Sequence, residues 1–587
     1  MLVRRVYSQS LLVLILASMI SMLGALVDGM VIGNLLGDTP IAAYGIAIPM
    51  TVLVVGIAYA ISGGGQALCG QALGRGDQKS ADSYFSNVLV WGVIFGLVVT
   101  ILCIVFSDGI STLLGAAKES GELFTEVKAY LLGYVPGSAF IILTLSLSSF
   151  MHLENDQNRA IAAAIIGTAV NIAGDFVAVL LLHGGLFEIA LATTISYGVM
   201  TVILLGRYFG KTHVLSFRIK EAGIKKCGEM LSIGLPSADI QVCSVFRSVF
   251  LNRLLLVIAS EAAVSAFSIR MSMYNLYGSV VIGFGMATLL VGSFFIGEEN
   301  TAAIRQMLKT ALLQGLVVTT TICVLVWFLA RPFVNIYTDD PAVAQMAVNS
   351  IRWFALSLPV FVVNSIFAKY YQAIGKSALS HLITIMENLV FVCLFALILG
   401  KGFSVDGVWA AFLVTEAATL FMTFLIVAFR NKRFPHAFLD WMLLPEGFGV
   451  PEEDLLIIEC REQTDVTAVS ERVAGFLTAH GENESVANKL SLCTEELMKN
   501  CFSFSTEKKR WRSAYLMLLD KGAEWLLCIR DVGKSFDPKE WLSHHDRSFE
   551  HMGLLLVNAA ADDMSFLYTL KMNQVSIRLK KEYGRNL

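Results

Sequence analysis

The sequence predicts an all-α polytopic membrane domain of twelve helices in two six-helix lobes, followed by a C-terminal α+β domain. The first observation is composition: of 587 residues, 56% are hydrophobic and only 16% are charged, against roughly 25% charged in soluble domains. The second is that apolar runs of bilayer length recur up to residue 429, and the third is that charge becomes dense after residue 451. These observations exclude a purely soluble enzyme.

Twelve apolar runs are each long enough to cross a bilayer as a helix of about 20 residues. The first follows a short basic stretch that resembles the start of a signal peptide. It is long and has no clear small-residue cleavage site, so we expect an uncleaved first helix. The runs lie at approximately 11–33, 41–63, 84–106, 128–150, 160–182, 187–207, 230–257, 263–294, 311–330, 345–370, 380–400 and 407–429.

Net charge and cysteine usage exclude several other classes of protein. The net charge is −3, without the basic excess that attracts nucleic acid, so we expect no nucleic-acid partner. The ten cysteines are scattered, with no CxxC pair. We therefore expect neither a structural metal nor a disulfide framework.

Basic residues in the connecting loops predict the orientation in the membrane. Seventeen Lys and Arg residues fall in loops on one side, against Lys118, Arg331 and Lys401 on the other. Because short cytoplasmic loops are enriched in Lys and Arg, both termini are predicted to be cytoplasmic in a multi-pass protein of the cell (plasma) membrane.

The membrane part is predicted to be an internal repeat. Shifting residues 43–77 by 223 positions aligns Met50 with Met273 and Gly74 with Gly297. Two such halves fit the parallel-repeat plan of transporters, in which the substrate cavity lies between the lobes near mid-membrane. The predicted units are an N-lobe at 1–206, an inter-lobe loop at 207–229, a C-lobe at 230–430, a linker at 431–450 and the soluble domain at 451–587.

Several short motifs resemble those of the multidrug and toxic compound extrusion (MATE) family, over about residues 8–430. They are Val27-Asp-Gly-Met-Val-Ile-Gly33, Ala42-Ala-Tyr-Gly45, Gly70-Gln-Ala-Leu-Gly-Arg-Gly-Asp77, Val170-Asn-Ile-Ala-Gly-Asp175 and Gly234-Leu-Pro236. The resemblance implies two bundles that rock between outward-open and inward-open states. It also implies export of small organic compounds, cationic ones among the candidates, in exchange for H⁺ or Na⁺.

Two acids inside the apolar runs are candidates for the coupling site. Asp28 lies in the first run and Asp175 in the fifth, where a charge at the bilayer centre costs at least ~2.5–3.5 kcal/mol. Asn171 is four residues before Asp175 and so on the same helix face. Similarity to MATE proteins implies that Asp28 and Asp175 belong to an N-lobe cation site. The alternative is structural, with Asp28 bonding a neighbouring helix and Asp175 holding Asn171.

The second lobe carries charges of both signs within or near its apolar runs. One interpretation is that they neutralise one another, because buried charges persist when paired. The other is a cavity lining that sets substrate preference or relays protons. The charges are Asp239, Arg247, Arg270, Lys369, Glu387 and Glu416.

Three consecutive glycines in the second run, Gly63, Gly64 and Gly65, invite comparison with a phosphate-binding loop. They lie inside a membrane segment and precede no Lys at a helix start. Small residues there allow close helix approach. We therefore predict that they pack helices together.

The soluble domain is predicted to be α+β, with a strand at 454–458, helices at 467–480 and 484–503, and a hairpin at 514–529. Three motifs in order resemble the N, G1 and G2 boxes of the GHKL ATP-binding fold, in its serine-kinase anti-sigma-factor branch, over about 451–582. They are Glu495-Glu-Leu-Met-Lys-Asn500, Asp531-Val-Gly-Lys-Ser-Phe-Asp-Pro538 and Gly553-Leu-Leu-Leu-Val557.

The second resemblance implies Mg-ATP chemistry at named residues. Asn500 would coordinate Mg²⁺ and Glu496 would act as the catalytic base. Asp531 would accept from the adenine amino group, while Gly533 and Gly553 would let the backbone approach the nucleotide. Ser535 replaces the usual second glycine of the G1 box, and Met552 or His551 the first glycine of the G2 box. The alternative is a scaffold that no longer binds nucleotide.

The sequence thus predicts a secondary active exporter with a regulatory ATP-binding domain and a cytosolic protein as a further candidate partner. Whether the C-terminal domain is an enzyme is left open. Two alternatives are a membrane-anchored signalling serine kinase or anti-sigma-like regulator, and a flippase of lipid-linked precursors. The substrate and the choice between H⁺ and Na⁺ are not predicted.

Overall fold

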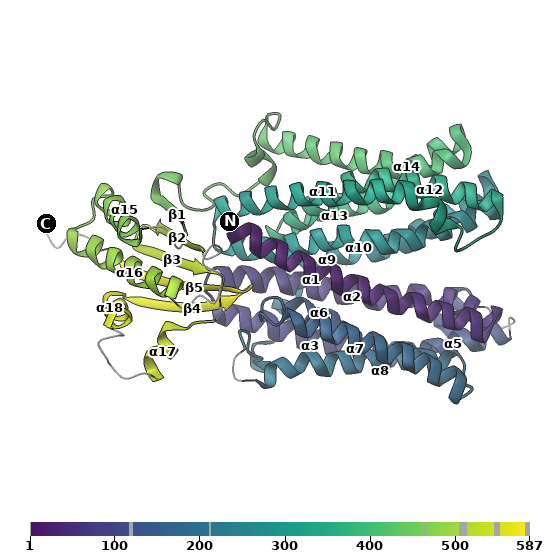
Figure 1. Ribbon diagram of the computed structural model, residues 1–587. Coiled ribbons are helices and arrows are strands. Elements are labelled where there is room, and N and C mark those ends of the chain that lie inside the picture. The colour runs from purple at the N-terminus through teal and green to yellow at the C-terminus, as the bar shows by residue number, and fades with distance from the viewer. Residues whose placement is uncertain are drawn as a thin grey trace.

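A computed structural model describes residues 2–116, 121–210, 213–461, 465–503, 513–533, 535–544 and 552–581. Long helices make up the chain to residue 431, and a small sheet with its own helices lies against one end of them (Figure 1). We call this the docked end, and the opposite end of the helical unit the far end.

The first lobe holds the helices predicted from its six apolar runs. Pro136 lies in a short 3₁₀ turn, η3 (Val135–Gly137), which joins two of these helices into one span, Glu122–Phe150. The helices are α1 (Leu2–Val31), α2 (Asp38–Gly74), α3 (Gln78–Val105), α4 (Ser107–Leu114), α5 (Glu122–Tyr134), α6 (Ser138–Phe150), α7 (Gln157–Phe176) and α8 (Leu186–Leu205).

The second lobe repeats this plan. Its helices are α9 (Ile224–Ile258), α10 (Glu261–Gly297), α11 (Thr301–Val334), α12 (Pro341–Ala373), α13 (Ser377–Ile385) and α14 (Phe391–Asn431). Several predicted boundaries were wrong. The second run, predicted to end at residue 63, continues as α2 to Gly74, and α11 begins at Thr301, not residue 311. The first helix begins at Leu2, not residue 11, and α9 begins at Ile224, inside the predicted loop 207–229. Hydropathy finds only the apolar part of a helix, and these helices extend past it through polar turns.

Eleven segments of the described chain are long and apolar enough to span a membrane. The last, Ser377–Asn431, has 55 residues, or about 80 Å of helix against ~30 Å of hydrocarbon. Its backbone breaks at Phe403 and Ser404, where φ of Ser404 is 53°. After the break, Gly407 lies directly against the carbonyl of Leu399. The segment therefore crosses twice, and the eleven segments agree with twelve predicted crossings.

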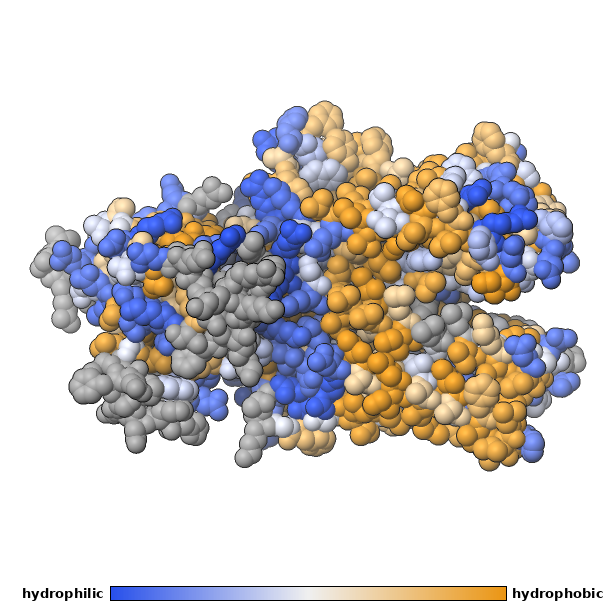
Figure 2. Space-filling view, in the orientation of Figure 1, coloured by the Kyte–Doolittle hydropathy of each residue, from blue (hydrophilic) through white to orange (hydrophobic). Residues whose placement is uncertain are grey.

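Among the described residues, the lobes pack most closely toward the docked end. Between Ala58 and Gly74 of α2, all but two residues are buried, and the same holds between Gly278 and Gly297 of α10. Toward the far end, buried and exposed residues alternate in both helices. Figure 2 shows the surface hollowed between the lobes at that end, with a hydrophobic band across the helical unit on the face in view.

Glycines make the close approach possible, as predicted for Gly64. A Cβ on Gly64 would lie 1.8 Å from the Met230 carbonyl oxygen, and one on Gly234 would lie 1.7 Å from that of Ala60. The repeat-related pair does the same at the docked end, where a Cβ on either Gly74 or Gly297 would come within 2.1 Å of a backbone oxygen of the other lobe. Any side chain at these positions would separate the lobes.

The C-terminal unit is a five-stranded antiparallel sheet in the order β1-β2-β3-β5-β4. The hairpin is confirmed as β2 and β3, with Asp520 opposite Trp525. Its elements are β1 (Leu455–Arg461), α15 (Val466–Ala479), α16 (Glu484–Ser503), β2 (Ser513–Asp520), β3 (Glu524–Asp531), α17 (Pro538–His544), α18 (Met552–Ala560), β4 (Asp563–Thr569) and β5 (Met572–Lys580).

Both faces of this sheet are covered. Alternate residues of β2, Leu516 and Leu518, belong to the core formed with α15 and α16. Tyr515, Met517 and Leu519 point the other way and share a core with the membrane helices. The C-terminal unit therefore packs its second face against the docked end, and Figure 1 shows the unit beside that end.

The linker also lies against the helical unit. It contains the 3₁₀ helix η8 (Phe438–Met442), whose backbone accepts hydrogen bonds from two tyrosines of α12. Tyr370 Oη donates to the Met442 carbonyl at 2.8 Å and Tyr371 Oη to the Trp441 carbonyl at 2.9 Å.

Candidate functional site

The predicted N-lobe residues come together where α1 and α7 pack. Asp175 is fully buried and Asn171 nearly so, and the Asp28 carboxyl lies beside both side chains. Neither oxygen of Asp175 has a hydrogen-bond partner among the described residues. Asn171 Nδ2 donates to Thr193 Oγ1 of α8 at 3.3 Å, which leaves its oxygen available. Two carboxyl groups and an amide side chain thus lie together, a set of groups suited to a small cation or a shared proton.

Tyrosines that the sequence analysis did not identify surround these acids. Asp28 and Asp175 lie close enough to the hydroxyls of Tyr44 and Tyr130 to interact with them electrostatically. Tyr44 and Tyr130 pack edge to face, with ring centroids 5.4 Å apart, and Tyr134 stacks on Tyr130. A phenol supplies both an apolar ring and a hydroxyl, so this wall gives the site both apolar and polar contacts.

Local π-helical turns mark the acids in both lobes. Asp28 precedes η1 (Ile32–Leu36), Asp175 precedes η4 (Val177–Leu181), and Glu387 lies within η7 (Met386–Val390). A π turn widens the backbone and frequently occurs at functional sites. No residue pattern in the sequence indicated these turns.

The second-lobe charges form two groups with different surroundings. In the first group, Asp239 pairs with His381 on α13. Lys369 lies at the lobe interface, where its ammonium donates to Ser237 Oγ at 2.6 Å and to Gln372 Oε1 at 3.0 Å. These contacts give both side chains hydrogen-bond partners, but none of them pairs two of the six predicted charges.

The second group lines a small cavity of about 20 Å³ that includes Arg247, Arg270, Glu387 and Glu416. Arg247 donates to Asn388 Oδ1 at 3.2 Å. The Arg270 guanidinium lies 3.7 Å from the ring centroid of Phe412, and two of its nitrogens have no hydrogen-bond partner within the described chain. The two glutamates lie beside each other. This group retains unsatisfied polar atoms and fits the cavity-lining interpretation better.

The C-terminal motifs are also brought together. Gly553 of α18 lies directly against Glu496, since a Cβ there would be 1.9 Å from Glu496 Oε2. Glu496 Oε1 accepts from Lys499 Nζ at 3.3 Å. Asn500, one turn further along α16, is half-buried. The predicted N and G2 boxes therefore contact each other.

The G1 residues lie at the C-terminal end of α16. Asp531 lies beside Cys501, and its Oδ1 accepts from Asn573 Nδ2 at 3.0 Å. The Gly533 carbonyl accepts from Tyr568 Oη at 3.2 Å. Ser535 is exposed. His551 and the side chain of Met552 lie outside the described residues.

A third region joins the C-terminal unit to both lobes. In the N-lobe, the loop between α6 and α7 makes three hydrogen bonds to the β4–β5 hairpin. Asn155 Nδ2 donates to the Tyr568 carbonyl at 2.6 Å, Asn155 Oδ1 accepts from Lys571 N at 2.5 Å, and Thr569 Oγ1 donates to the Leu153 carbonyl at 2.9 Å.

In the C-lobe, the turn between α10 and α11 contacts β2 and β3. Arg530 forms a buried ion pair with Glu298, and Lys521 Nζ lies 2.9 Å from Glu299 Oε2. Burial raises the pKa of Glu298 to about 7, against the opposing effect of Arg530. This region was not predicted from the sequence, although β2 is apolar at nearly every position, a pattern typical of strands buried on both faces.

Two helical lobes with a repeated plan, closed at one end and hollowed between them at the other, define a two-lobed membrane transporter. The MatE family model matches residues 14–177 and 236–398, more than half of the chain. The chain belongs to the MatE family. The matched stretches are one in each lobe, which agrees with the predicted repeat, and they end before the C-terminal unit.

Curated relatives and solved structures agree with this assignment. The chain is 21% identical over 424 residues to Multidrug export protein MepA of Staphylococcus aureus (strain bovine RF122 / ET3-1), covering 72% of this chain and 92% of the relative. MepA of Staphylococcus haemolyticus (strain JCSC1435) is also 21% identical, with 71% and 92% covered.

Among solved structures, an outward-facing MATE transporter of the MOP superfamily superimposes with a TM-score of 0.69 at 21% identity, covering 73% of this chain and 96% of that one. A Vibrio cholerae MATE transporter gives 0.67 at 19% identity, with 73% and 97% covered. These likenesses establish the fold of the helical unit.

Proposed function

We propose that the chain is a secondary active exporter of small organic compounds, driven by H⁺ or Na⁺ and regulated by its C-terminal unit. The observation that carries the proposal is the meeting of Asp28, Asn171 and Asp175 in one buried site beside the tyrosines. Export of drug-like compounds is supported by membership of the MatE family and by the relatives named as multidrug export proteins.

The site would couple transport to a gradient because two carboxyl groups cannot both stay charged when buried together. One proton or one cation neutralises the pair. Binding and release of this proton or cation would change how α1 and α7 pack against each other. That change would alter the conformation of the N-lobe. Only a ligand that binds the two states of the transporter differently can shift their populations.

We propose that the C-terminal unit binds Mg-ATP at the contact between α16, α18 and the end of β3. The support for this ligand is the direct contact between the two boxes, since Gly553 admits the Glu496 carboxylate at a distance where any Cβ would clash with it. Asn500 would hold Mg²⁺, and Asp531 would accept from the adenine amino group. Bound Mg-ATP would serve either as a regulatory ligand or as a phosphate donor. The unit has no P-loop pattern, so we assign it regulation and not the driving of transport.

We further propose that the docked unit restrains the lobes. It bonds the N-lobe through Asn155 and the C-lobe through Glu298 and Glu299, and so bridges the seam that the lobes must open for access from the docked end. The basic loops predict that this end faces the cytoplasm. Labelling of a cysteine introduced at Lys220 only from the cytoplasmic side, and of one at Gly37 only from outside, tests that orientation.

Counterflow in proteoliposomes tests the whole proposal. Full-length protein and a chain ending at residue 450 would be compared under imposed H⁺ and Na⁺ gradients. We expect gradient-driven transport in both, faster in the shorter chain. Transport that requires ATP hydrolysis at each turnover would overturn the proposal, and phosphorylation of a serine on a cytosolic protein without transport would support the signalling alternative.

A further inference from the structure

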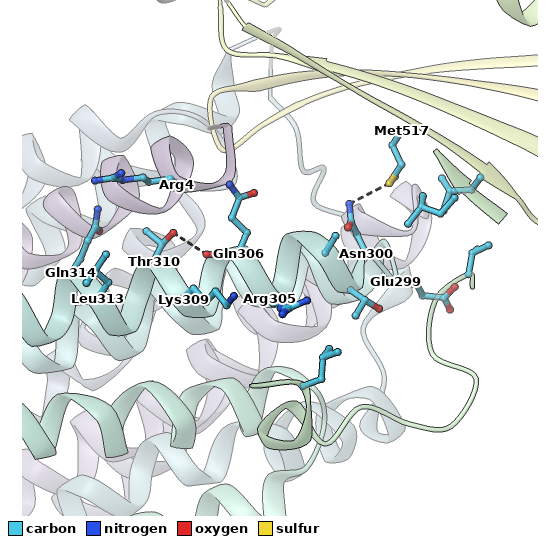
Figure 3. A pocket seen from close by; sticks show the side chains of 16 residues that line it. Arg4, Glu299, Asn300, Arg305, Gln306, Lys309, Thr310, Leu313, Gln314 and Met517 are labelled. Atoms are coloured by element: carbon cyan, nitrogen blue, oxygen red, sulfur yellow. Dashed lines mark hydrogen bonds between the residues drawn. The ribbon is translucent and has the colours of Figure 1, made fainter. Parts of the chain in front are cut away.

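A cavity of about 720 Å³ lies at the docked end, where three parts of the chain meet. The start of α1 contributes Arg4, the start of α11 contributes Arg305 and Lys309, and the sheet contributes Met517 and Leu519. Figure 3 shows Arg305 and Lys309 one turn apart on α11, with Arg4 extending from the neighbouring helix. None of these residues belongs to the sites described above.

The cavity has an excess of positive charge. Its only acidic lining residue is Glu299, and the carboxylate of Glu299 is already paired with Lys521 at 2.9 Å. Within the described chain, no carboxylate lies within 4 Å of Arg4, Arg305 or Lys309. Three unpaired cations around one cavity favour an anion, and arginine in particular favours phosphate oxygens.

The same cavity is partly apolar and reaches the lipid-facing surface. Leu313 and Leu439 line it, and both are exposed to a large extent, at 62% and 43%. Because α1 and α11 are membrane-spanning and the cavity lies at their ends, it is at the level of lipid headgroups.

An apolar groove of about 600 Å³ continues from it between α11, α12 and α14. Aromatic residues of α14 and η8, among them Phe421, Phe424, Phe438 and Trp441, line this groove. The two cavities adjoin at η8: Lys309 lines the first, and its ammonium lies 5.7 Å from the ring centroid of Phe438, which lines the second. A cationic cavity that continues into an apolar groove matches an anionic headgroup that continues into an acyl chain.

We propose that these two cavities bind one anionic phospholipid, with its phosphate between Arg4, Arg305 and Lys309 and an acyl chain in the groove of Phe421 and Trp441. The site is complete only while the sheet is docked, because Met517 and Leu519 form one wall of the headgroup cavity. If the C-terminal unit restrains the lobes as proposed above, the lipid strengthens that restraint. The binding itself does not depend on the transport activity.

Native mass spectrometry of the full chain tests the proposal. Purified protein would be titrated with dioleoyl phosphatidylglycerol, with dioleoyl phosphatidylcholine and with glycerol 3-phosphate. We expect one phosphatidylglycerol retained at least tenfold more tightly than phosphatidylcholine, and no competition from glycerol 3-phosphate at equal concentration. Displacement by glycerol 3-phosphate at equal concentration would assign the cavity to a soluble phosphate and overturn the lipid proposal.

Variants separate this site from general membrane electrostatics. The triple variant Arg4→Gln, Arg305→Gln, Lys309→Gln should lose at least tenfold in phosphatidylglycerol affinity. The control Lys79→Gln, Lys220→Gln, Lys225→Gln removes the same charge from exposed residues outside the cavity and should bind as the unmodified chain does. Equal losses in both would overturn the proposal.

Two further variants distinguish loss of lipid binding from loss of folding. Arg305→Lys with Lys309→Arg keeps the charge and should retain affinity within threefold. Phe421→Asn alters a groove residue that is 61% exposed, so folding should be unaffected. This variant should weaken the binding of dioleoyl phosphatidylglycerol but not that of dihexanoyl phosphatidylglycerol, because only long acyl chains reach the groove. Equal weakening of both lipids would show that the groove holds no acyl chain and would overturn that part of the proposal.

Discussion

Arg530 of β3 and Glu298 after α10 form an ion pair whose side chains are 1% and 3% exposed. The pair joins the C-terminal unit to the C-lobe, and Arg530 is held on its other side by Gln574, whose Oε1 accepts from its Nε at 3.1 Å. Removing one partner of a buried ion pair leaves an uncompensated charge. The docked arrangement should therefore depend on both residues.

Arg530→Ala should release the C-terminal unit from the docked end. The loss of one partner in a buried pair costs about 3–5 kcal/mol, which should weaken docking even though one face of the sheet also packs against the membrane helices. We expect faster amide hydrogen exchange in β2 and β3 and faster export in proteoliposomes. Arg578→Ala is the control, because its pair with Glu524 in the same sheet is loose, at 3.7 Å, and largely exposed. Unchanged exchange in Arg530→Ala would show that the pair does not hold the unit.

Docking should weaken as pH rises through the range set by Glu298. Burial raises the pKa of Glu298 from its ordinary 4.5 to about 7 in the docked state. Between pH 4.5 and pH 7, docking is therefore accompanied by uptake of a proton on Glu298. Docking is strongest below about pH 4.5, weakens as the pH rises to about 7, and does not change further above about pH 7. Hydrogen exchange of β2 measured against pH should follow this course.

Two variants test the assignment to Glu298. Glu298→Gln removes the titrating group and should give a flat profile over the same range. Glu299→Gln, next in the chain and 49% exposed at its side chain, should keep the slope. A slope that persists in Glu298→Gln would place the proton elsewhere.

Gly64→Ala should open the seam between the lobes at the docked end. The added methyl would lie 1.8 Å from the Met230 carbonyl oxygen, so the backbones of α2 and α9 must separate. We expect a lower melting temperature and faster exchange in both helices near this contact. Gly45→Ala in the same helix meets no atom within 4 Å and should leave both measurements unchanged. If Gly64→Ala behaved like Gly45→Ala, the seam would not be as tight as described.

The sequence predicted the helices well because a membrane span is specified by local composition. Twenty apolar residues can satisfy their backbone only as a helix within lipid. Boundaries failed at Leu2, Ile224 and Thr301, among others, where polar turns continue the helix and hydropathy carries no signal. The break at Ser404 was predicted as a loop between two runs, since Lys401 interrupts the apolar residues there.

The candidate sites were predictable only where the residues themselves are unusual. A charge within an apolar run is costly, so Asp28 and Asp175 stood out without a structure. Tyr44 and Tyr130 did not, because tyrosine is ordinary in a membrane helix and only packing brings these rings to the acids. The contact of Glu298 with Arg530 joins residues 232 apart in the chain, and neither shows a local pattern that indicates a partner.

Asp175→Asn and Asp28→Asn should each stop gradient-driven export while leaving the protein folded. An amide cannot take up and release a proton, and it lacks the charge that binds a cation. We expect at least a tenfold fall in export driven by the coupling ion. Asp38→Asn, at the exposed start of α2, is the control and should transport normally. Full activity in both Asp28→Asn and Asp175→Asn would move the coupling site elsewhere, with Glu387 and Glu416 the next candidates.

Binding of Mg-ATP to the full chain should separate the roles of two residues on α16. Asn500→Ala should weaken Mg²⁺-dependent ATP binding about tenfold, because the metal loses an oxygen ligand. Glu496→Ala should preserve binding but abolish phosphate transfer, since a general base acts on the nucleophile and not on the bound nucleotide. Titration calorimetry in detergent measures the first effect, and release of labelled phosphate measures the second. Asn488→Ala, exposed on the same helix, should match the unmodified chain in both. Absence of binding to the unmodified chain at millimolar ATP would show that Ser535 and the substituted G2 box have disabled the pocket, and the unit would then act by docking alone.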